Sequence, residues 1–200
     1  MKEIDQMKVS REQAAESRQR VIEIASKLFR ERGLDGIGVA DLMKSAGFTH
    51  GGFYRHFGSK EDLMAEACAQ AVSASAAKLG ELIEQAPENA LAAVTSSYLS
   101  SAHCEQPGEG CVLAALGSEA ARHGEAVRHA LTKGLRDFID LLTAIVPGRS
   151  KAARREKALA TYASMVGAVV LARSVDDPAL AEQILQSVST SILNPSSGRS

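Results

Sequence analysis

The sequence predicts an all-α protein of about nine helices. Apolar residues recur at helical spacing along most of the chain, and no segment alternates apolar and polar residues as a half-buried strand does. Only 5 of the 200 residues are Pro, the residue that most disrupts helices, and the 16 Gly are spread out rather than clustered. Because only 4% of the residues are aromatic and none is Trp, Ala, Leu, Val and Ile must fill most of the core.

Capping residues and Gly or Pro breaks set the expected helix boundaries. Ser10 with Gln13 and Ser59 with Asp62 match capping-box start signals, and Gly33 is placed to end the first helix. The later breaks are expected at Pro87, residues 106–110, Gly124, residues 147–148 and residues 176–178. The expected helices therefore span about residues 10–32, 39–46, 49–58, 60–85, 89–103, 112–123, 125–146, 150–175 and 178–193.

Residues 38–63 carry the most information about function. They are expected to form a short helix, a turn at Gly47, a second short helix that is basic and aromatic, and then a freshly capped third helix. Two short helices joined by a turn of about 3–4 residues containing Gly form a helix-turn-helix, whose second helix can lie in the major groove of DNA. This segment therefore predicts a DNA-binding unit.

The second of these short helices, which Thr49 is suited to cap, has a predicted inner face and a predicted outer face. Phe53 and Phe57 lie four residues apart and form the expected core face. The residues left to point outward are His50, Gly51, Tyr54 and Arg55. Gly51-Gly52 costs on the order of 1 kcal/mol per Gly relative to Ala within a helix. Close approach of the backbone to DNA is one reason to tolerate that cost; the alternative is that Gly-Gly simply forms a loop.

Charge is distributed unevenly along the chain. Residues 1–60 carry 11 Lys and Arg against 8 Asp and Glu, a net of +3, whereas residues 61–200 have a net charge of −4. A small basic unit on an acidic body fits a localised DNA footprint. Lys60, in the first turn of the third helix, suits a phosphate oxygen, and Arg18 could clamp the DNA backbone likewise; each alone is also an ordinary surface charge.

These residues resemble the TetR family of repressors. The resemblance covers about the first third of the chain and rests on Ser17-Arg18, Leu28-Phe29, Gly33, Val39-Ala40-Asp41-Leu42, Ala46-Gly47-Phe48-Thr49 and Phe53-Tyr54-Arg55-His56-Phe57-Gly58-Ser59-Lys60-Glu61-Asp62-Leu63. It implies a homodimer with a helix-turn-helix DNA-binding domain in residues 10–58. It also implies a ligand-binding and dimerisation domain in residues 59–194, whose last two helices, about residues 150–193, pair in a four-helix bundle.

The resemblance also implies which residues contact double-stranded operator DNA. By position, base contacts are implied for His50, Gly51 and Tyr54, and contacts to phosphates or the groove wall for Thr49, Tyr54, Arg55, His56 and Lys60. Many relatives have Ser or Thr where this chain has Gly38, the expected N-cap of the first helix of the motif. A hydroxyl contact to phosphate is therefore missing at Gly38, although Gly is an acceptable N-cap.

The C-terminal helices carry more apolar surface than one small domain easily hides. The helical stripe comprises Leu180, Ile184, Leu185, Val188 and Ile192, and residues 159–171 are apolar almost all round. A self-complementary dimer interface would bury this surface. The alternative is ordinary intramolecular core.

The segment from His103 to Glu119 looks like that of a subgroup of TetR repressors in which Gly-Cys opens a helix near the ligand cavity. In some similar repressors that cysteine senses electrophiles or oxidants, and a helix N-terminus stabilises a thiolate. Cys111 would then be the sensor, Cys104 a resolving partner, and Arg173 a neighbour that tunes the thiol. The alternatives are a buried packing role for Cys111 and an effector that binds without reacting. The residues expected to line the cavity are Tyr98, Cys111, Phe138 and Tyr162.

Several function classes fit the sequence poorly. The N-terminus has no apolar signal region, and the longest apolar stretch, residues 158–172, is shorter than the roughly 20 residues that span a bilayer. Three Cys without a scaffold pattern favour a reducing, cytoplasmic location. A thiol redox enzyme or a zinc site built on His103, Cys104 and Cys111 is the rival, but the spacing is not C-x-x-C and no fourth zinc ligand is evident.

The predicted function is therefore a dimeric DNA-binding repressor, released from its operator by a small-molecule or thiol-reactive effector. No enzymatic activity, cofactor, metal or membrane contact is expected.

Overall fold

The computed structural model describes the backbone of residues 2–194 and the side chains of residues 11–194. Within this part of the chain every regular element is a helix, nine of them α-helices, which confirms the predicted fold class. The α-helices are α1 (Lys2–Arg32), α2 (Val39–Ser45), α3 (Lys60–Gln85), α4 (Ala90–Tyr98), α5 (Ser101–Glu105), α6 (Val112–Ala120), α7 (Glu125–Ile145), α8 (Lys151–Ser174) and α9 (Pro178–Leu193). The 3-10 helices are η1 (His50–Arg55), η2 (Pro87–Asn89) and η3 (Pro107–Glu109).

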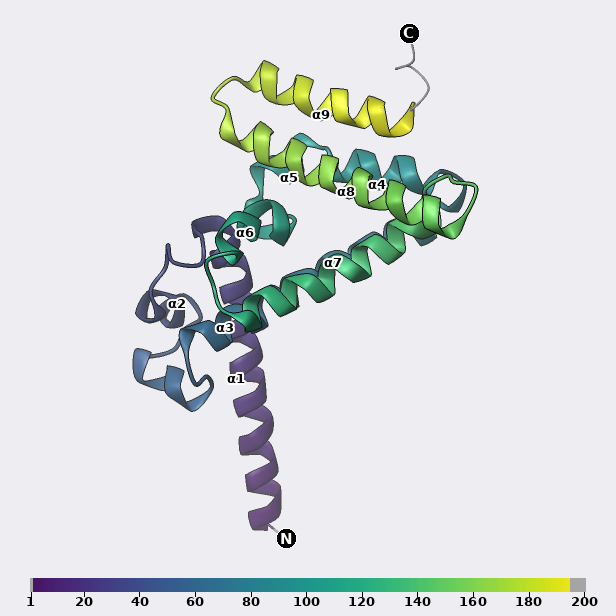
Figure 1. The fold of residues 1–200 in the computed structure, drawn as a ribbon. Coiled ribbons are helices and arrows are strands. Elements are labelled where there is room, and N and C mark those ends of the chain that lie inside the picture. Colours follow the sequence, from purple (N-terminus) through teal and green to yellow (C-terminus); the bar gives the residue numbers. More distant parts are fainter. Residues whose placement is uncertain (1, 195–200) are drawn as a thin grey trace.

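The N-terminal unit consists of α1, α2 and η1, packed against the start of α3 (Figure 1). Its apolar core gathers side chains such as Val21, Phe29, Leu42 and Phe53, all of them almost fully buried. The same core continues into α6 and the first turns of α7. The N-terminal unit and the helical body therefore share one apolar core. The expected boundary between the two domains, at residues 58 and 59, falls at Ser59, which is the N-cap of α3.

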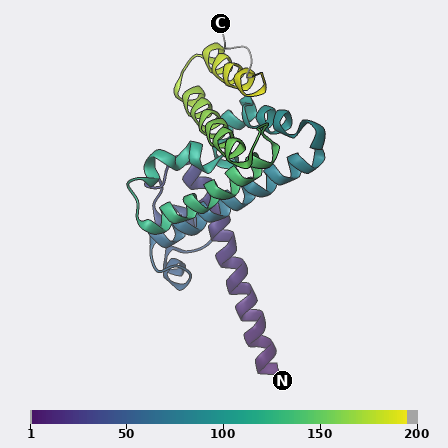
Figure 2. The same ribbon diagram turned by 45° about the vertical axis from the view of Figure 1, so that its right-hand side comes forward.

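The body is organised around α3 and α7, which run side by side along most of their length (Figures 1 and 2). They pack closely because Gly134 of α7 has no side chain. A Cβ atom at this position would lie 1.7 Å from Cγ1 of Val72 on α3. A second apolar core joins the end of α3 to α4, α7, α8 and α9.

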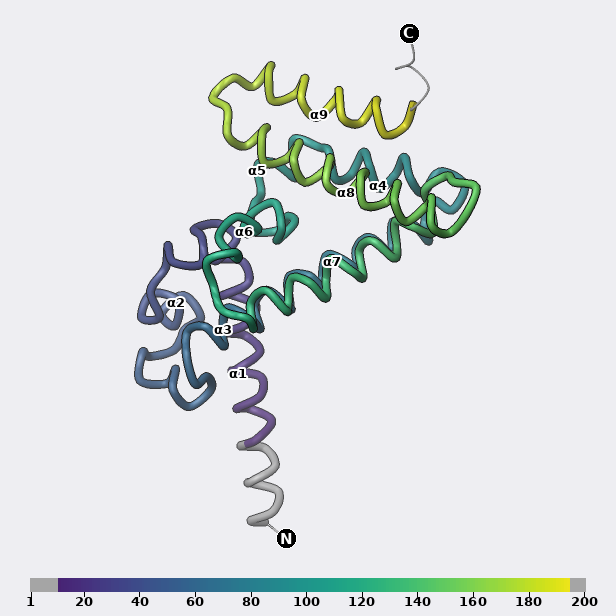
Figure 3. Tube along the Cα trace, viewed as in Figure 1, coloured from purple at the N-terminus to yellow at the C-terminus, as the bar shows by residue number. Residues whose placement is uncertain are grey.

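The trace passes from α2 through η1 into α3, which carries the chain from the N-terminal unit into the body (Figure 3). The pair α8 and α9 lies at the opposite end of the molecule from α2 and η1 (Figures 1 and 2). None of the described helices is both long and apolar enough to cross a bilayer.

Two helix boundaries differ from the sequence-based expectation. The first helix begins at Lys2 rather than at Ser10, so the start signal at Ser10 lies inside a continuous helix; the side chain of Ser10 lies outside the described residues. The helix expected over residues 89–103 is divided after Tyr98, because the backbone of Leu99 leaves the helical region and Ser100 is extended. Ser100 then caps α5, since its hydroxyl accepts a hydrogen bond from the His103 N–H at 3.2 Å.

Candidate functional site

The helix-turn-helix is built by local signals in the sequence. Leu42 and Met43 of α2 are buried, and α2 ends where Gly47 adopts φ +84°, a left-handed conformation that favours glycine. The N–H of Phe48 donates to the carbonyl of Met43 at 2.8 Å and closes the turn. Gly38 is the N-cap of α2 in an extended conformation and makes no side-chain capping bond.

The second element of the motif is a 3-10 helix rather than the expected α-helix. The N–H of Gly52 donates to Thr49 at 3.0 Å and the N–H of His56 donates to Phe53 at 2.9 Å, both in the i to i+3 pattern. Two adjacent glycines in a six-residue segment explain the difference, because each weakens the α-helix. Thr49 is the N-cap, as expected, but its side chain makes no capping bond.

The two faces of η1 lie as the four-residue spacing predicts. Phe53 and Phe57 are buried, with ring centroids 5.5 Å apart, and they fix the element to the core. Tyr54 is 70% exposed, and its ring packs edge-on near the ring of His50 at 6.3 Å. The other exposed residues of the predicted contact set here are Gly38, Thr49, His50, Gly51 and Arg55.

Three predicted contact residues are partly engaged within the protein. The Nε of Arg18 donates to the carbonyl of His56 at 3.2 Å, its guanidinium pairs with Glu66, and it lies 4.9 Å over the Phe57 ring. His56 is half-buried. The Lys60 side chain is 27% exposed, and its Nζ lies 3.9 Å from a carboxylate oxygen of Asp35, so only a loose ion pair competes for it.

The centre of the motif carries basic residues and no acidic ones. Between Asp41 and Glu61 the sequence has no acidic residue, and it has three cations, Lys44, Arg55 and Lys60. An exposed, partly basic segment with an aromatic hydroxyl and a glycine backbone at its centre is suited to a polyanion such as duplex DNA.

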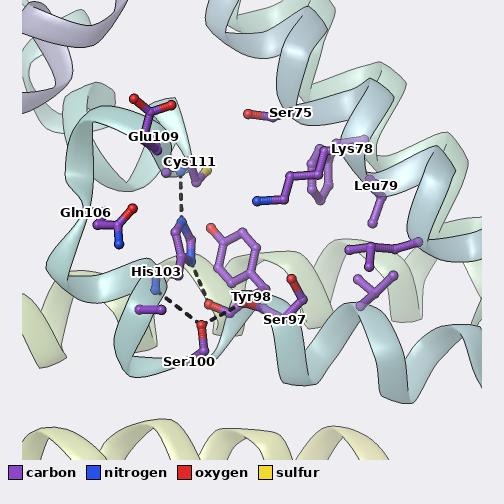
Figure 4. Close-up of a pocket in the computed structure, with 15 residues that line it drawn as sticks. Ser75, Lys78, Leu79, Ser97, Tyr98, Ser100, His103, Gln106, Glu109 and Cys111 are labelled. Carbon is purple, nitrogen blue, oxygen red and sulfur yellow. Dashed lines mark hydrogen bonds between the residues drawn. The ribbon is translucent and has the colours of Figure 1, made fainter.

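The body contains a cavity of about 250 Å³ between α3, α4, α7 and the segment that leads into α6 (Figure 4). Its apolar wall includes Leu79, Val94 and Phe138. Its polar wall includes Lys78, Tyr98, His103 and Cys111. The predicted lining residues Tyr98, Cys111 and Phe138 are thus brought together. Tyr162 instead lies behind the cavity wall, stacked on Phe138 at 4.5 Å between ring centroids.

Cys111 is held in place from three directions at the N-terminus of α6. It is the N-cap of this helix, it is buried, and its Sγ lies 3.3 Å from the Tyr162 hydroxyl. Its N–H donates to Nε2 of His103 at 2.9 Å. Because Nε2 accepts, Nδ1 must carry the proton, and it donates to the carbonyl of Tyr98 at 2.6 Å. Burial lowers the pKa of His103, which agrees with this neutral form.

Arg173 lies close to this segment, where it contacts main-chain atoms. Its Nε and one terminal nitrogen donate to the carbonyls of Cys104 and His103 at 3.0 and 2.6 Å. Burial raises the pKa of the Cys104 thiol. Burial also raises the pKa of Cys68 to about 12, which leaves that thiol unreactive, in keeping with a packing role. In the part of the chain that the structure describes, no three His, Cys, Asp or Glu side chains form a cluster able to hold a metal ion.

Comparisons with known proteins agree with this geometry. The family model for bacterial regulatory proteins of the tetR family matches residues 21–67. The regulator AcrR of Shigella flexneri is 35% identical over 57 residues, which are 28% of this chain and 26% of that protein. The repressor NemR of Escherichia coli strain K12 is 28% identical over 131 residues, which are 64% of this chain and 66% of that protein. Residues 21–67 therefore match the TetR-family DNA-binding domain, and the chain as a whole resembles TetR-family regulators.

Solved structures show the same fold over nearly the whole chain. The reduced form of Escherichia coli NemR superposes with a TM-score of 0.75 at 24% identity and covers 90% of this chain and 96% of that one. A TetR-family regulator from Agrobacterium tumefaciens superposes with a TM-score of 0.74 at 23% identity, over 90% of this chain and 98% of that one. The TetR fold thus extends through the helical body, beyond the segment that carries the family motifs.

In this chain, polar contacts connect the cavity segment to the N-terminal unit. Arg30 of α1 donates to the carbonyl of Gly110 at 2.9 Å, directly before Cys111. Glu119 of α6 accepts from the N–H of Leu34, two residues after the end of α1, at 2.8 Å. Both ends of α6 are therefore tied to the end of α1.

Sequence reasoning missed Lys78 and the two contacts described above. Lys78 lies in a polar, Ala-rich part of α3, where no motif sets it apart from a solvated surface lysine. Arg30 and Glu119 are separated from their partners by 80 and 85 residues, and only the packing of the body on the N-terminal unit brings them together.

Proposed function

We propose that the chain is a homodimeric transcriptional repressor that binds a pseudo-palindromic operator and is released from it by an effector. The observation that carries this proposal is η1, whose buried Phe53 and Phe57 leave Tyr54 70% exposed, within a stretch, residues 42–60, that has no acidic residue. A dimer would place one such element in each of two successive major grooves. DNA binding also implies the predicted cytoplasmic location.

The contact residues have distinct proposed roles. His50, Gly51 and Tyr54 contact base edges, and Gly51 allows the backbone to approach closely, since nothing lies within 4 Å of its missing Cβ. Residues assigned to phosphates or the groove wall are Thr49, Arg55, His56 and Lys60. Gly38 contributes less, because it has no hydroxyl. Arg18 has a positioning role, since its contacts to His56 and Phe57 hold the end of the motif.

The dimer is proposed to form through α8 and α9. Leu159, Val170 and Leu171 of α8 and Leu180 of α9 are each more than 40% exposed. Large aliphatic side chains in this density on two adjacent helices favour a self-complementary interface that removes them from water.

The effector is proposed to act through α6. A small molecule in the cavity, or an electrophile bonded to Cys111, would press on the N-terminus of α6 and on Gly110. Because Arg30 and Glu119 tie this segment to α1, its displacement would move the DNA-binding unit. Thermodynamic linkage then requires operator DNA to weaken effector affinity by the same factor by which the effector weakens operator affinity. The relatives that share the fold are regulators by name, which supports a non-enzymatic role.

The test of the DNA-binding proposal is a binding-site selection from a randomised duplex pool. The intact protein should enrich a two-fold repeated sequence, whereas the Tyr54→Ala variant should lose about 1–3 kcal/mol of specific binding. Failure of the intact protein to enrich any sequence would refute the proposal.

The reacting thiol is tested separately. Iodoacetamide forms a sulfur–carbon bond with a thiolate, iodide leaves, and the thiol proton passes to buffer. If Cys111 is the sensor, treatment should release operator from the wild type and from a Cys104→Ser control, but not from Cys111→Ser. Equal release of operator from the wild type, Cys104→Ser and Cys111→Ser would show that Cys111 is not the sensor. The remaining hypothesis would be an effector that binds in the cavity without reacting.

A further inference from the structure

The cavity in the body has an unsatisfied polar group in its wall. Tyr98 is only 9% exposed, yet its hydroxyl has no hydrogen-bond partner of acceptable geometry among the described residues, although the Cys111 thiol lies beside it. Burying a hydroxyl without a partner is unfavourable, so such groups in a cavity wall indicate a missing ligand atom. Burial raises the pKa of Tyr98, so the phenol stays protonated and can donate a hydrogen bond.

The second feature of the cavity is Lys78, an exposed lysine of its wall that has no ion-pair partner among the described residues. The Lys78 side chain extends from α3 into the space in front of the Tyr98 ring (Figure 4). No described carboxylate forms an ion pair with it. The carboxylate in the lining is that of Glu109, and it already pairs with Lys27 at 3.1 Å.

The surrounding charges add to this positive field. Arg30 and Arg173 are partly buried next to the same segment, and both donate to main-chain carbonyls rather than to carboxylates. Neither arginine forms an ion pair within 4.0 Å in the described part of the chain, although the Glu109 and Glu31 carboxylates lie near enough to attract Arg30. Positive groups in a concave site with low-dielectric walls concentrate field lines and favour an anion.

The rest of the wall is apolar. Leu79, Val94 and Phe138 line the cavity, and Leu79 lies on the side away from His103 (Figure 4). The volume of about 250 Å³ falls below the roughly 300–1,000 Å³ of sites for drug-sized ligands, so the occupant must be small.

We propose that the cavity binds a small organic carboxylate, with its oxygens on the Lys78 ammonium and the Tyr98 hydroxyl and its apolar part against Leu79, Val94 and Phe138. This inference rests on the proposed effector role of the cavity and specifies the chemical class of the effector. Nucleophilic attack by Cys111 is not needed, because Lys78, Tyr98 and the apolar wall would hold the carboxylate without a covalent bond.

The test uses isothermal titration calorimetry with two acids and their uncharged counterparts. Benzoate is compared with benzamide, and hexanoate with hexanamide, so that shape is nearly constant and charge alone changes. The variants are Lys78→Gln, which removes the charge, and Tyr98→Phe, which removes only the hydroxyl. Lys133→Gln is the matched control, because Lys133 is an exposed lysine on α7 outside the cavity.

For the wild type and the Lys133→Gln control, we expect at least one acid to have a Kd at least about tenfold lower than that of its amide. A tenfold difference corresponds to about 1.4 kcal/mol. Lys78→Gln should abolish this preference, and Tyr98→Phe should weaken binding of the acid severalfold. Equal affinity for acid and amide, a preference that survives in Lys78→Gln, or no binding of either acid at millimolar concentration would overturn the inference.

The same preparations enter the selection from randomised duplex DNA. A protein that enriches a DNA sequence but shows no preference for acids refutes the carboxylate inference alone. A protein that prefers acids but enriches no DNA sequence refutes the proposed regulatory function and leaves the ligand class standing.

Discussion

Arg18 offers a sharp test of how the motif is held, because one side chain makes three different contacts to it. The Arg18→Met variant keeps an unbranched aliphatic side chain but has no guanidinium group. It therefore loses the hydrogen bond to the His56 carbonyl, the ion pair with Glu66 and the cation–π contact with the Phe57 ring. The ion pair contributes about 0.2–1 kcal/mol, since its side chains are 38% and 36% exposed. The cation–π contact contributes about 0.5–1 kcal/mol, and the hydrogen bond about 0.5–1.5 kcal/mol.

These three contributions share one side chain and do not add fully, so we expect Arg18→Met to lower the free energy of unfolding by about 1–2 kcal/mol. Urea denaturation followed by circular dichroism measures this change. Arg11→Met is the matched control, because Arg11 is an exposed residue of the same helix with no contact to the motif. Its free energy of unfolding should stay within about 0.5 kcal/mol of the wild type.

The salt dependence of operator binding separates positioning from a direct phosphate contact. If Arg18 positions the motif, Arg18→Met weakens binding and leaves the slope of log K against log salt unchanged. A direct phosphate contact would instead lower the magnitude of the slope by about 0.9. Unchanged stability together with a reduced slope would refute the positioning role.

Three further predictions concern a phosphate contact, a titrating side chain and a close helix packing. Lys60→Ala should weaken binding to all DNA sequences alike and lower the magnitude of the salt slope by about one, whereas a loss confined to the operator would contradict this role. Burial holds the pKa of His103 below its ordinary value of about 6.5, so the unfolded chain takes up the proton first as the pH falls. Stability is therefore lost from about pH 6.5 downward until the folded form is also protonated. The variant His103→Gln, whose amide oxygen can accept the same N–H, should lose less melting temperature than the wild type between about pH 7 and pH 5; equal losses would count against the interpretation. Gly134→Ala places a Cβ 1.7 Å from Cγ1 of Val72 and should lower the free energy of unfolding by about 1–3 kcal/mol, whereas Gly117→Ala, with nothing within 4 Å, should not; similar melting temperatures for the two variants would contradict the packing.

The sequence predicted the features that depend on local chemistry. Gly33 and Gly47 end α1 and α2 with positive φ, and Ser59 caps α3 by accepting the Asp62 N–H, because a turn or a cap involves only a few neighbouring residues. Phe53 and Phe57 were assigned to the core for the same reason.

Features that depend on tertiary packing were missed or misplaced. The break at Leu99 has no Gly or Pro to announce it. The ammonium group of Lys78 faces a cavity only because α3, α4 and α7 meet around it. No periodicity along one helix contains that information.

The central claim is that η1 of each subunit lies in the major groove of the selected operator. Dimethyl sulfate interference tests it directly, because this reagent methylates guanine N7 in the major groove and adenine N3 in the minor groove. The account predicts that methylation of guanine N7 within each half-site blocks binding. Binding that is insensitive to guanine N7 methylation and is blocked only by adenine N3 methylation would contradict it.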